Sequence, residues 1–140
     1  MKRKYILLPL LLLLIIQLTS CSNSVSVKET KELSIEFLEA IVANDQDKAK
    51  DILHPSAKDS DDVIKNFITQ LEENGINLEG EVSDLKVSNI STAVYTSEYQ
   101  GGSCEIQGSI KVGNEKYNFN TTVIKNSEGY GIIKFNISKQ

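Results

Sequence analysis

Apolar positions after residue 27 divide the chain into a helical half and a stranded half. Apolar residues at helical spacing predict helices from about Lys28 to Ala43, from about Asp45 to Leu53 and from about Ser60 to Glu73. The apolar stripe of the first helix is wide, as a helix that packs on a core requires. One face of the third helix groups Val63, Ile64, Phe67, Ile68 and Leu71.

Polar and turn-forming residues predict where these helices begin and end. The candidate N-caps are Ser26 or Thr30 for the first helix, Asp45 for the second and Ser60 for the third. Pro55 ends the second helix, because proline disfavours helical geometry in the residue before it. Asn74 and Gly75 are a typical C-terminal stop for the third.

From Glu81 onward the apolar residues alternate with a period of two, which predicts strands. The predicted buried faces are Cys104, Ile106, Ile110 and Val112, then Tyr117, Phe119, Thr121 and Val123, then Ile133, Phe135 and Ile137. Gly101-Gly102, Gly113-Asn114 and Ser127-Glu128-Gly129 are the predicted hairpin turns, and an earlier long strand or strand pair covers Val82 to Tyr99. Helices followed by an antiparallel meander predict an α+β domain, with one sheet face covered and the other wet.

The first twenty-one residues have the pattern of a secretory signal. Lys2-Arg3-Lys4 precedes an apolar run of thirteen positions from Ile6 to Leu18, which is short of the about 20 residues of a spanning helix. Leu18-Thr19-Ser20-Cys21 follows and resembles the lipobox of bacterial lipoproteins. The resemblance implies lipid attachment to the Cys21 sulfur and cleavage between Ser20 and Cys21. Two alternatives remain open. The apolar run could be an uncleaved signal anchor, or Cys21 could be a plain buried cysteine after an ordinary signal peptide.

This interpretation divides the chain into three parts. Residues 1–20 are the signal peptide, residues 21–27 are the lipidated cysteine and a short tether, and residues 28–140 are a single α+β domain. Two acyl chains give stable membrane anchoring where one chain is marginal. The expected location is therefore the extracytoplasmic face of a bacterial cell membrane.

Two segments of the domain resemble small bacterial lipoproteins of the nuclear transport factor 2-like (cystatin-like) superfamily. The first segment runs from Phe37 to Asp45 and on through Lys48 to Leu53, and the second is the hairpin end Gly129-Tyr130-Gly131-Ile132-Ile133. The last strand of these proteins often holds a tryptophan, where this chain has Tyr130. The resemblance implies a curved antiparallel sheet folded around the helices, with a cleft between them in some members.

Composition limits the classes of partner. The chain has 15 Lys+Arg and 19 Asp+Glu, for a formal net charge of −4. Loss of Lys2, Arg3 and Lys4 with the signal makes this charge −7, a poor match for nucleic acid or an anionic bilayer. Once Cys21 is lipidated, Cys104 has no disulfide partner, and a single histidine excludes a histidine-rich metal site.

Four groups of side chains are candidates for chemistry. His54 is either a general base in the cleft or, as we favour, a helix-end residue that interacts with the helix dipole. Asp59, Asp61 and Asp62 lack the glycine and spacing of a calcium loop, which favours acids in the first turn of a helix capped by Ser60. Tyr95, Tyr99, Tyr117 and Tyr130 either line a ligand site or pack in the sheet, and the second is favoured. Cys104 is predicted to be a buried thiol.

The sequence therefore favours a lipid-anchored, non-enzymatic module that binds a protein, peptide or small ligand, with no cofactor and no metal. Its partners are the membrane, through the lipid on Cys21, and an envelope protein or peptide. One alternative is an immunity or exclusion lipoprotein that intercepts a cationic peptide or other incoming agent. Others are a small cleft hydrolase or isomerase, and a structural subunit of an envelope complex, which would expose a large apolar patch.

Overall fold

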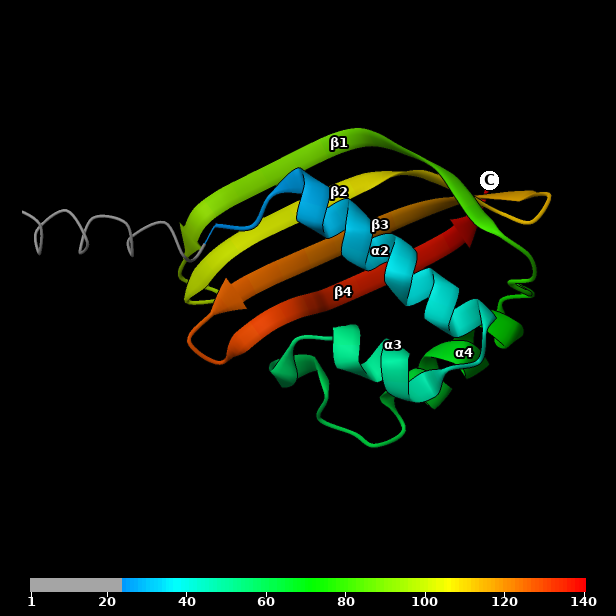
Figure 1. Cartoon of the computed structure of the whole chain (residues 1–140), viewed down its shortest axis with the longest axis horizontal. Coiled ribbons are helices and arrows are strands. Elements are labelled where there is room, and N and C mark those ends of the chain that lie inside the picture. Colours follow the sequence, from blue (N-terminus) through cyan, green and yellow to red (C-terminus); the bar gives the residue numbers. More distant parts are fainter. Residues whose placement is uncertain (1–23) are drawn as a thin grey trace, which may run out of the picture.

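The computed structural model describes residues 24–140 and has two layers (Figure 1). The helical layer consists of α2 (Val27–Val42), α3 (Gln46–Ile52), the 3-10 turn η1 (Pro55–Ala57) and α4 (Val63–Glu73). The sheet consists of β1 (Val82–Thr96), β2 (Gly101–Val112), β3 (Glu115–Asn126) and β4 (Gly129–Lys139). The α+β class is thus confirmed. The predicted signal peptide, the lipobox and Cys21 lie outside the described residues.

The strands form an antiparallel meander in the order β1-β2-β3-β4. Helix α2 runs diagonally across one face of the curved sheet and contacts all four strands, while α3, η1 and α4 lie beside β4 (Figure 1). Strands β2 and β3 pair without a register shift, whereas β1 has three shifts along its length. Such bulges hinder further strand addition at a sheet edge.

Helix α2 begins with a complete capping box. Ser26 Oγ accepts a hydrogen bond from the Glu29 N–H at 3.1 Å, and the Glu29 carboxylate accepts one from the Ser26 N–H at 2.8 Å. Of the two predicted caps, Ser26 is therefore the one used. The side chain of Val25 is only 5% exposed. The fold thus begins before the predicted boundary at residue 28, because part of the predicted tether packs against the core.

The other helix boundaries are partly as predicted. Asp45 caps α3, since its carboxylate accepts from the Lys48 N–H at 3.1 Å. Helix α4 starts at Val63, so the prediction that Ser60 caps it is wrong. Ser60 Oγ instead accepts from the Asp62 N–H at 3.1 Å and closes a local turn. The acidic residues around Ser60 consequently precede the helix and are absent from its first turn.

One predicted hairpin turn is misplaced. Gly101 and Gly102 belong to β2, and the β1–β2 turn is formed by residues 97–100, with Gln100 at φ 52°. A Cβ on Gly101 would collide with the carbonyl oxygen of Lys125 on β3. This glycine therefore permits close approach of two strands, which explains why it is no turn residue.

The core lies between α2 and the inner face of the sheet. The predicted faces of β2 and β3 are confirmed, since every side chain on them is at most 4% exposed. On β4 the predicted face is only partly buried, and Ile132 is fully buried instead. A register shift opposite Thr122 and Val123 displaces the alternation by one residue there.

Candidate ligand-binding cleft

An apolar cleft of about 280 Å³ lies where α2, η1, α4 and β4 meet. Phe37 comes from α2, Ala57 from η1, and Ile133 and Phe135 from β4. The remaining lining residues are Leu53, Val63, Ile64 and Phe67. Every lining side chain is a hydrocarbon, and several of them are only partly buried. The cleft therefore presents an apolar surface to solvent.

Three phenylalanines from three different elements form one wall of this cleft. The ring centroids of Phe37 and Phe135 are 5.0 Å apart, and those of Phe37 and Phe67 are 5.5 Å apart. Phe67 and Phe135 meet edge to face at 6.1 Å. These tilted arrangements are the ones that aromatic quadrupoles favour. Phe37 is 2% exposed and anchors the group, while Phe67 and Phe135 are partly exposed at the cleft.

Backbone contacts between the α3–η1 connection and β4 hold the cleft together. The His54 N–H donates to the Ile132 carbonyl at 2.9 Å, beside an isolated parallel bridge between Leu53 and Ile132. A Cβ on Gly131 would lie 2.5 Å from His54 N and 2.6 Å from the Leu53 carbonyl carbon. Only glycine permits this approach, so the β4 sequence fixes where the helical segment docks.

His54 is completely buried and locks the same junction. Its Nδ1 accepts from the Ser56 N–H at 3.1 Å and lies 2.7 Å from Ser56 Oγ. Its Nε2 lies 3.0 Å from Asn126 Oδ1. Because Nδ1 accepts a backbone hydrogen bond, Nε2 carries the proton and donates to Asn126.

The predicted interaction of His54 with the dipole of the preceding helix is therefore corrected. The ring is directed forward onto η1, where it caps the Ser56 N–H. His54 also does not line the apolar cleft.

The predicted tyrosine set is dispersed over the molecule. Tyr117 is buried, and its hydroxyl donates to the Asn77 carbonyl at 3.4 Å. Tyr99 lies in the β1–β2 turn and Tyr95 is exposed on β1, so packing in the sheet holds only for part of the set. Partial desolvation of the Tyr130 side chain, which is still 38% exposed, followed by the charges of nearby glutamates on α2, raises the pKa of Tyr130 to about 12. The four residues do not form one site.

Cys104 and the acidic residues also have defined places. Cys104 is fully buried on β2, as predicted, and burial raises the pKa of its thiol. Asp61 pairs with Lys50 at 3.0 Å on the surface. Within residues 24–140 no group of three or more His, Cys, Asp or Glu side chains is placed to hold a metal ion.

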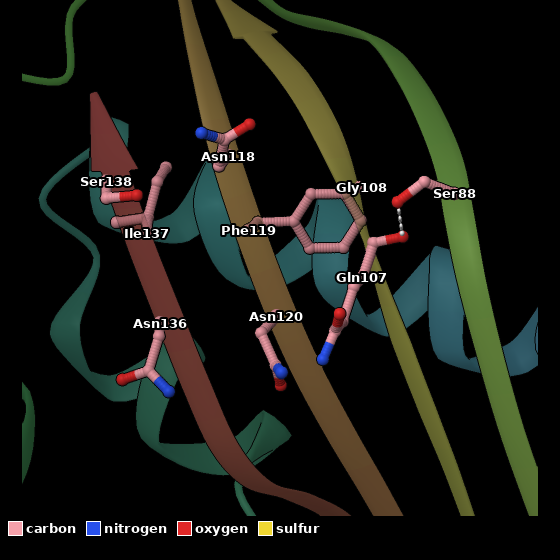
Figure 2. A pocket seen from close by; sticks show the side chains of 9 residues that line it. All are labelled: Ser88, Gln107, Gly108, Asn118, Phe119, Asn120, Asn136, Ile137 and Ser138. Carbon is pink, nitrogen blue, oxygen red and sulfur yellow. Dashed lines mark hydrogen bonds between the residues drawn. The ribbon is translucent and has the colours of Figure 1, made fainter. Parts of the chain in front are cut away.

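A second depression, of about 320 Å³, lies on the outer face of the sheet (Figure 2). Amide and hydroxyl side chains from all four strands line it, together with Gly108, Phe119 and Ile137. Ser88 Oγ donates to the Gln107 carbonyl at 3.2 Å, as Figure 2 shows. Glu105 accepts from both the Gln107 and the Asn120 amides, at 3.2 and 3.1 Å. Some of these polar groups are thus already hydrogen-bonded within the sheet, whereas the side chains that line the apolar cleft are all hydrocarbon, and we take the cleft as the candidate ligand site.

The sequence does not predict which residues line the cleft, because they come from three stretches that are distant in the chain: residue 37, residues 53–67 and residues 133–135. One signal was present: three of the four phenylalanines of the chain lie in it. Their spacing predicts that all three face the core, but Phe67 and Phe135 are only partly buried and lie at its edge.

Comparison with known proteins gives no family assignment, because no family model and no curated protein matches this sequence. Among the described residues, no helix combines the length and the apolar character needed to cross a bilayer.

Proposed function

We propose that this protein is a non-enzymatic binding module, held at the extracytoplasmic face of a bacterial membrane by lipid on Cys21, whose cleft receives an apolar group. The observation that carries the binding role is the cleft of about 280 Å³ with its hydrocarbon lining. For comparison, an apolar cavity of about 150 Å³ lined by Leu, Ile and Phe binds benzene. The ligand class is therefore an apolar side chain of a peptide or a small hydrocarbon.

The lipid anchor is supported by the sequence alone. Leu18, Thr19, Ser20 and Cys21 follow a basic cluster and a short apolar run, in the order of a lipoprotein signal. Cleavage between Ser20 and Cys21 would leave the modified cysteine three residues before Ser24, where the described fold begins. Tethering confines the domain and its ligand to a thin layer, so modest affinity suffices.

The same proposal includes a nuclear transport factor 2-like (cystatin-like) fold. Three features support it: a long first helix, a curved meander around that helix, and a cleft between helices and sheet (Figure 1). A non-enzymatic role is supported by the lining, in which no side chain can donate or accept a proton. General acid–base catalysis needs such a group within hydrogen-bond reach of the substrate.

The binding role is tested by titrating benzene into a chain that lacks residues 1–21 and keeps every described element. Methyl NMR reports on Ile64 and Ile133, which both line the cleft. We expect saturable shifts of these methyl signals. The variant Ala57→Phe places a benzene-sized group in the cleft from a partly buried position. It should weaken binding at least about tenfold, because the apolar contacts are already occupied.

Ala43→Phe is the matched control, since Ala43 is exposed at the C-cap of α2 and does not line the cleft. It should bind benzene as the unmodified chain does. If Ala57→Phe binds benzene with unchanged affinity, or if methyl groups outside the cleft shift as much as those of Ile64 and Ile133, the proposed site is wrong.

One observation favours the alternative of cationic-peptide interception. Four exposed glutamates follow one stripe of α2 at helical spacing, namely Glu29, Glu32, Glu36 and Glu39. An oligolysine peptide should bind this stripe in a salt-dependent manner. Glu32→Gln/Glu36→Gln should then weaken binding more than the equally charged control Glu72→Gln/Glu73→Gln on α4. Equal losses in the two variants would mean that net charge alone attracts the peptide.

A further inference from the structure

Exposed apolar side chains of the described residues are concentrated on one strand. Val94 is 78% exposed, Tyr95 66% and Ile90 56%, and all three lie on β1. The fourth large exposed hydrophobic residue of the described chain, Tyr130, is the second residue of β4. Single exposed apolar residues are common on protein surfaces, but Val94 and Tyr95 are adjacent and each at least 66% exposed, so they mark a candidate contact surface, called here the Val94–Tyr95 cluster.

This cluster lies where the described chain begins. Residues 24–27 and 92–94 together line one surface depression. Figure 1 shows the segment that leads into α2, the end of β1 and the start of β4 at one end of the sheet, with the β2–β3 turn at the other. Val94 and Tyr95 are therefore at the end of the domain from which the chain leads back to Cys21.

The length of the intervening chain limits how far this end can be from the lipid. Cys21 is three residues before Ser24, and an extended chain spans at most about 3.6 Å per residue, or about 11 Å in total. Val25 is buried, so residues after Ser24 cannot lengthen the tether without leaving the core. The headgroup layer is about 5–8 Å deep on each side of a bilayer. The tether is thus barely longer than this layer is deep.

We propose that the Val94–Tyr95 end of the domain rests in the headgroup layer of the membrane and fixes the orientation of the domain. The proposal rests on the lipid anchor of the proposed function. Tyrosine is enriched at membrane interfaces because its ring is apolar and its hydroxyl is polar. Glu98 and Glu128 lie in the two turns at this end, so attraction to anionic lipid is not the driving force. The contact is expected with neutral phosphatidylcholine.

The test uses the full lipidated protein in phosphatidylcholine vesicles that contain a headgroup-labelled quencher lipid. A fluorophore is placed through Ser97→Cys, which leaves Val94 and Tyr95 intact, or through Asn114→Cys in the β2–β3 turn. Both positions are exposed. Labelling is selective because Cys104 is fully buried and Cys21 is held as a thioether. We expect at least about threefold stronger quenching at position 97 than at position 114.

Adding Val94→Ser/Tyr95→Ser to the Ser97→Cys chain should reduce this quenching towards that of position 114. The mass of the same sample confirms lipid on Cys21. If the protein is lipidated and positions 97 and 114 are quenched equally, the orientation is wrong while the anchor stands. A mass without lipid contradicts the anchor and the orientation together. Quenching at position 97 that changes with the protein-to-lipid ratio would mean that a second copy covers the cluster, which also overturns the proposal.

Discussion

Two buried threonines give opposite predictions for the same substitution. Thr121 and Thr30 are both fully buried. Thr30 Oγ1 donates to the Ser26 carbonyl at 2.9 Å, whereas Thr121 Oγ1 has no hydrogen-bond partner among residues 24–140. A buried polar group without a partner costs about 1–3 kcal/mol, and a typical hydrogen bond contributes about 0.5–1.5 kcal/mol net. Valine has nearly the same shape as threonine, so it removes the hydroxyl without leaving a cavity.

Thr121→Val should therefore raise the free energy of unfolding by about 1–3 kcal/mol. Thr30→Val should lower it by about 0.5–1.5 kcal/mol, because the bond to the Ser26 carbonyl is lost. Urea unfolding at neutral pH measures both values, and an unchanged dependence on urea shows that the denatured state is unaffected. If Thr121→Val is destabilising, the hydroxyl has a partner and the interpretation of this core position is wrong.

Three further predictions concern the junctions of the fold. His54→Phe roughly keeps the ring volume but removes the hydrogen bonds to Ser56 and Asn126, so the free energy of unfolding in urea should fall by about 2–3 kcal/mol. A fall of less than about 0.5 kcal/mol would contradict the role of His54 in holding this junction. Gly131→Ala should cost more than about 3 kcal/mol or prevent folding, since its Cβ would lie 2.5 Å from His54 N; a circular dichroism melt near that of the unmodified chain would refute this. Hydrogen bonds from the Ser26 N–H and hydroxyl lower the pKa of Glu29 from its ordinary value of 4.5. The ionised Glu29 side chain therefore stabilises the fold above pH 4.5, and this contribution is lost as the pH falls through the lowered pKa. The stability gap to Glu29→Gln should accordingly close in acid, and a gap that does not change with pH would argue against the capping box.

The fold class follows from the sequence because each half of the chain has one clear period. The helix caps Ser26 and Asp45 were predictable as well, since each lies directly before an apolar helical run. The prediction that Ser60 caps the third helix was wrong because its hydroxyl closes a local turn before the helix begins. The pair Gly101-Gly102 was wrongly predicted as a turn because glycine is used for close strand approach as well as for turns, and only the position of the Lys125 carbonyl distinguishes the two roles.

The candidate cleft depends on contacts that no local pattern encodes. Phe37 and Phe67 fit helical stripes and Phe135 fits a strand face, so each of them alone predicts a core position. Their meeting point depends on the docking of η1 against β4, which is set by Gly131 and by the buried ring of His54. The role of His54 was likewise hidden, because its partner Asn126 is 72 residues away in the chain.

The lipid anchor on Cys21 is the central claim, and the intact mass of the protein extracted from bacterial membranes tests it most directly. The account predicts a chain that begins at Cys21 and carries a diacylglyceryl group, while Cys21→Ser stays uncleaved at its full 140 residues without lipid. An unmodified Cys21 in the membrane-bound protein, or a Cys21→Ser chain of the same processed length, would contradict it.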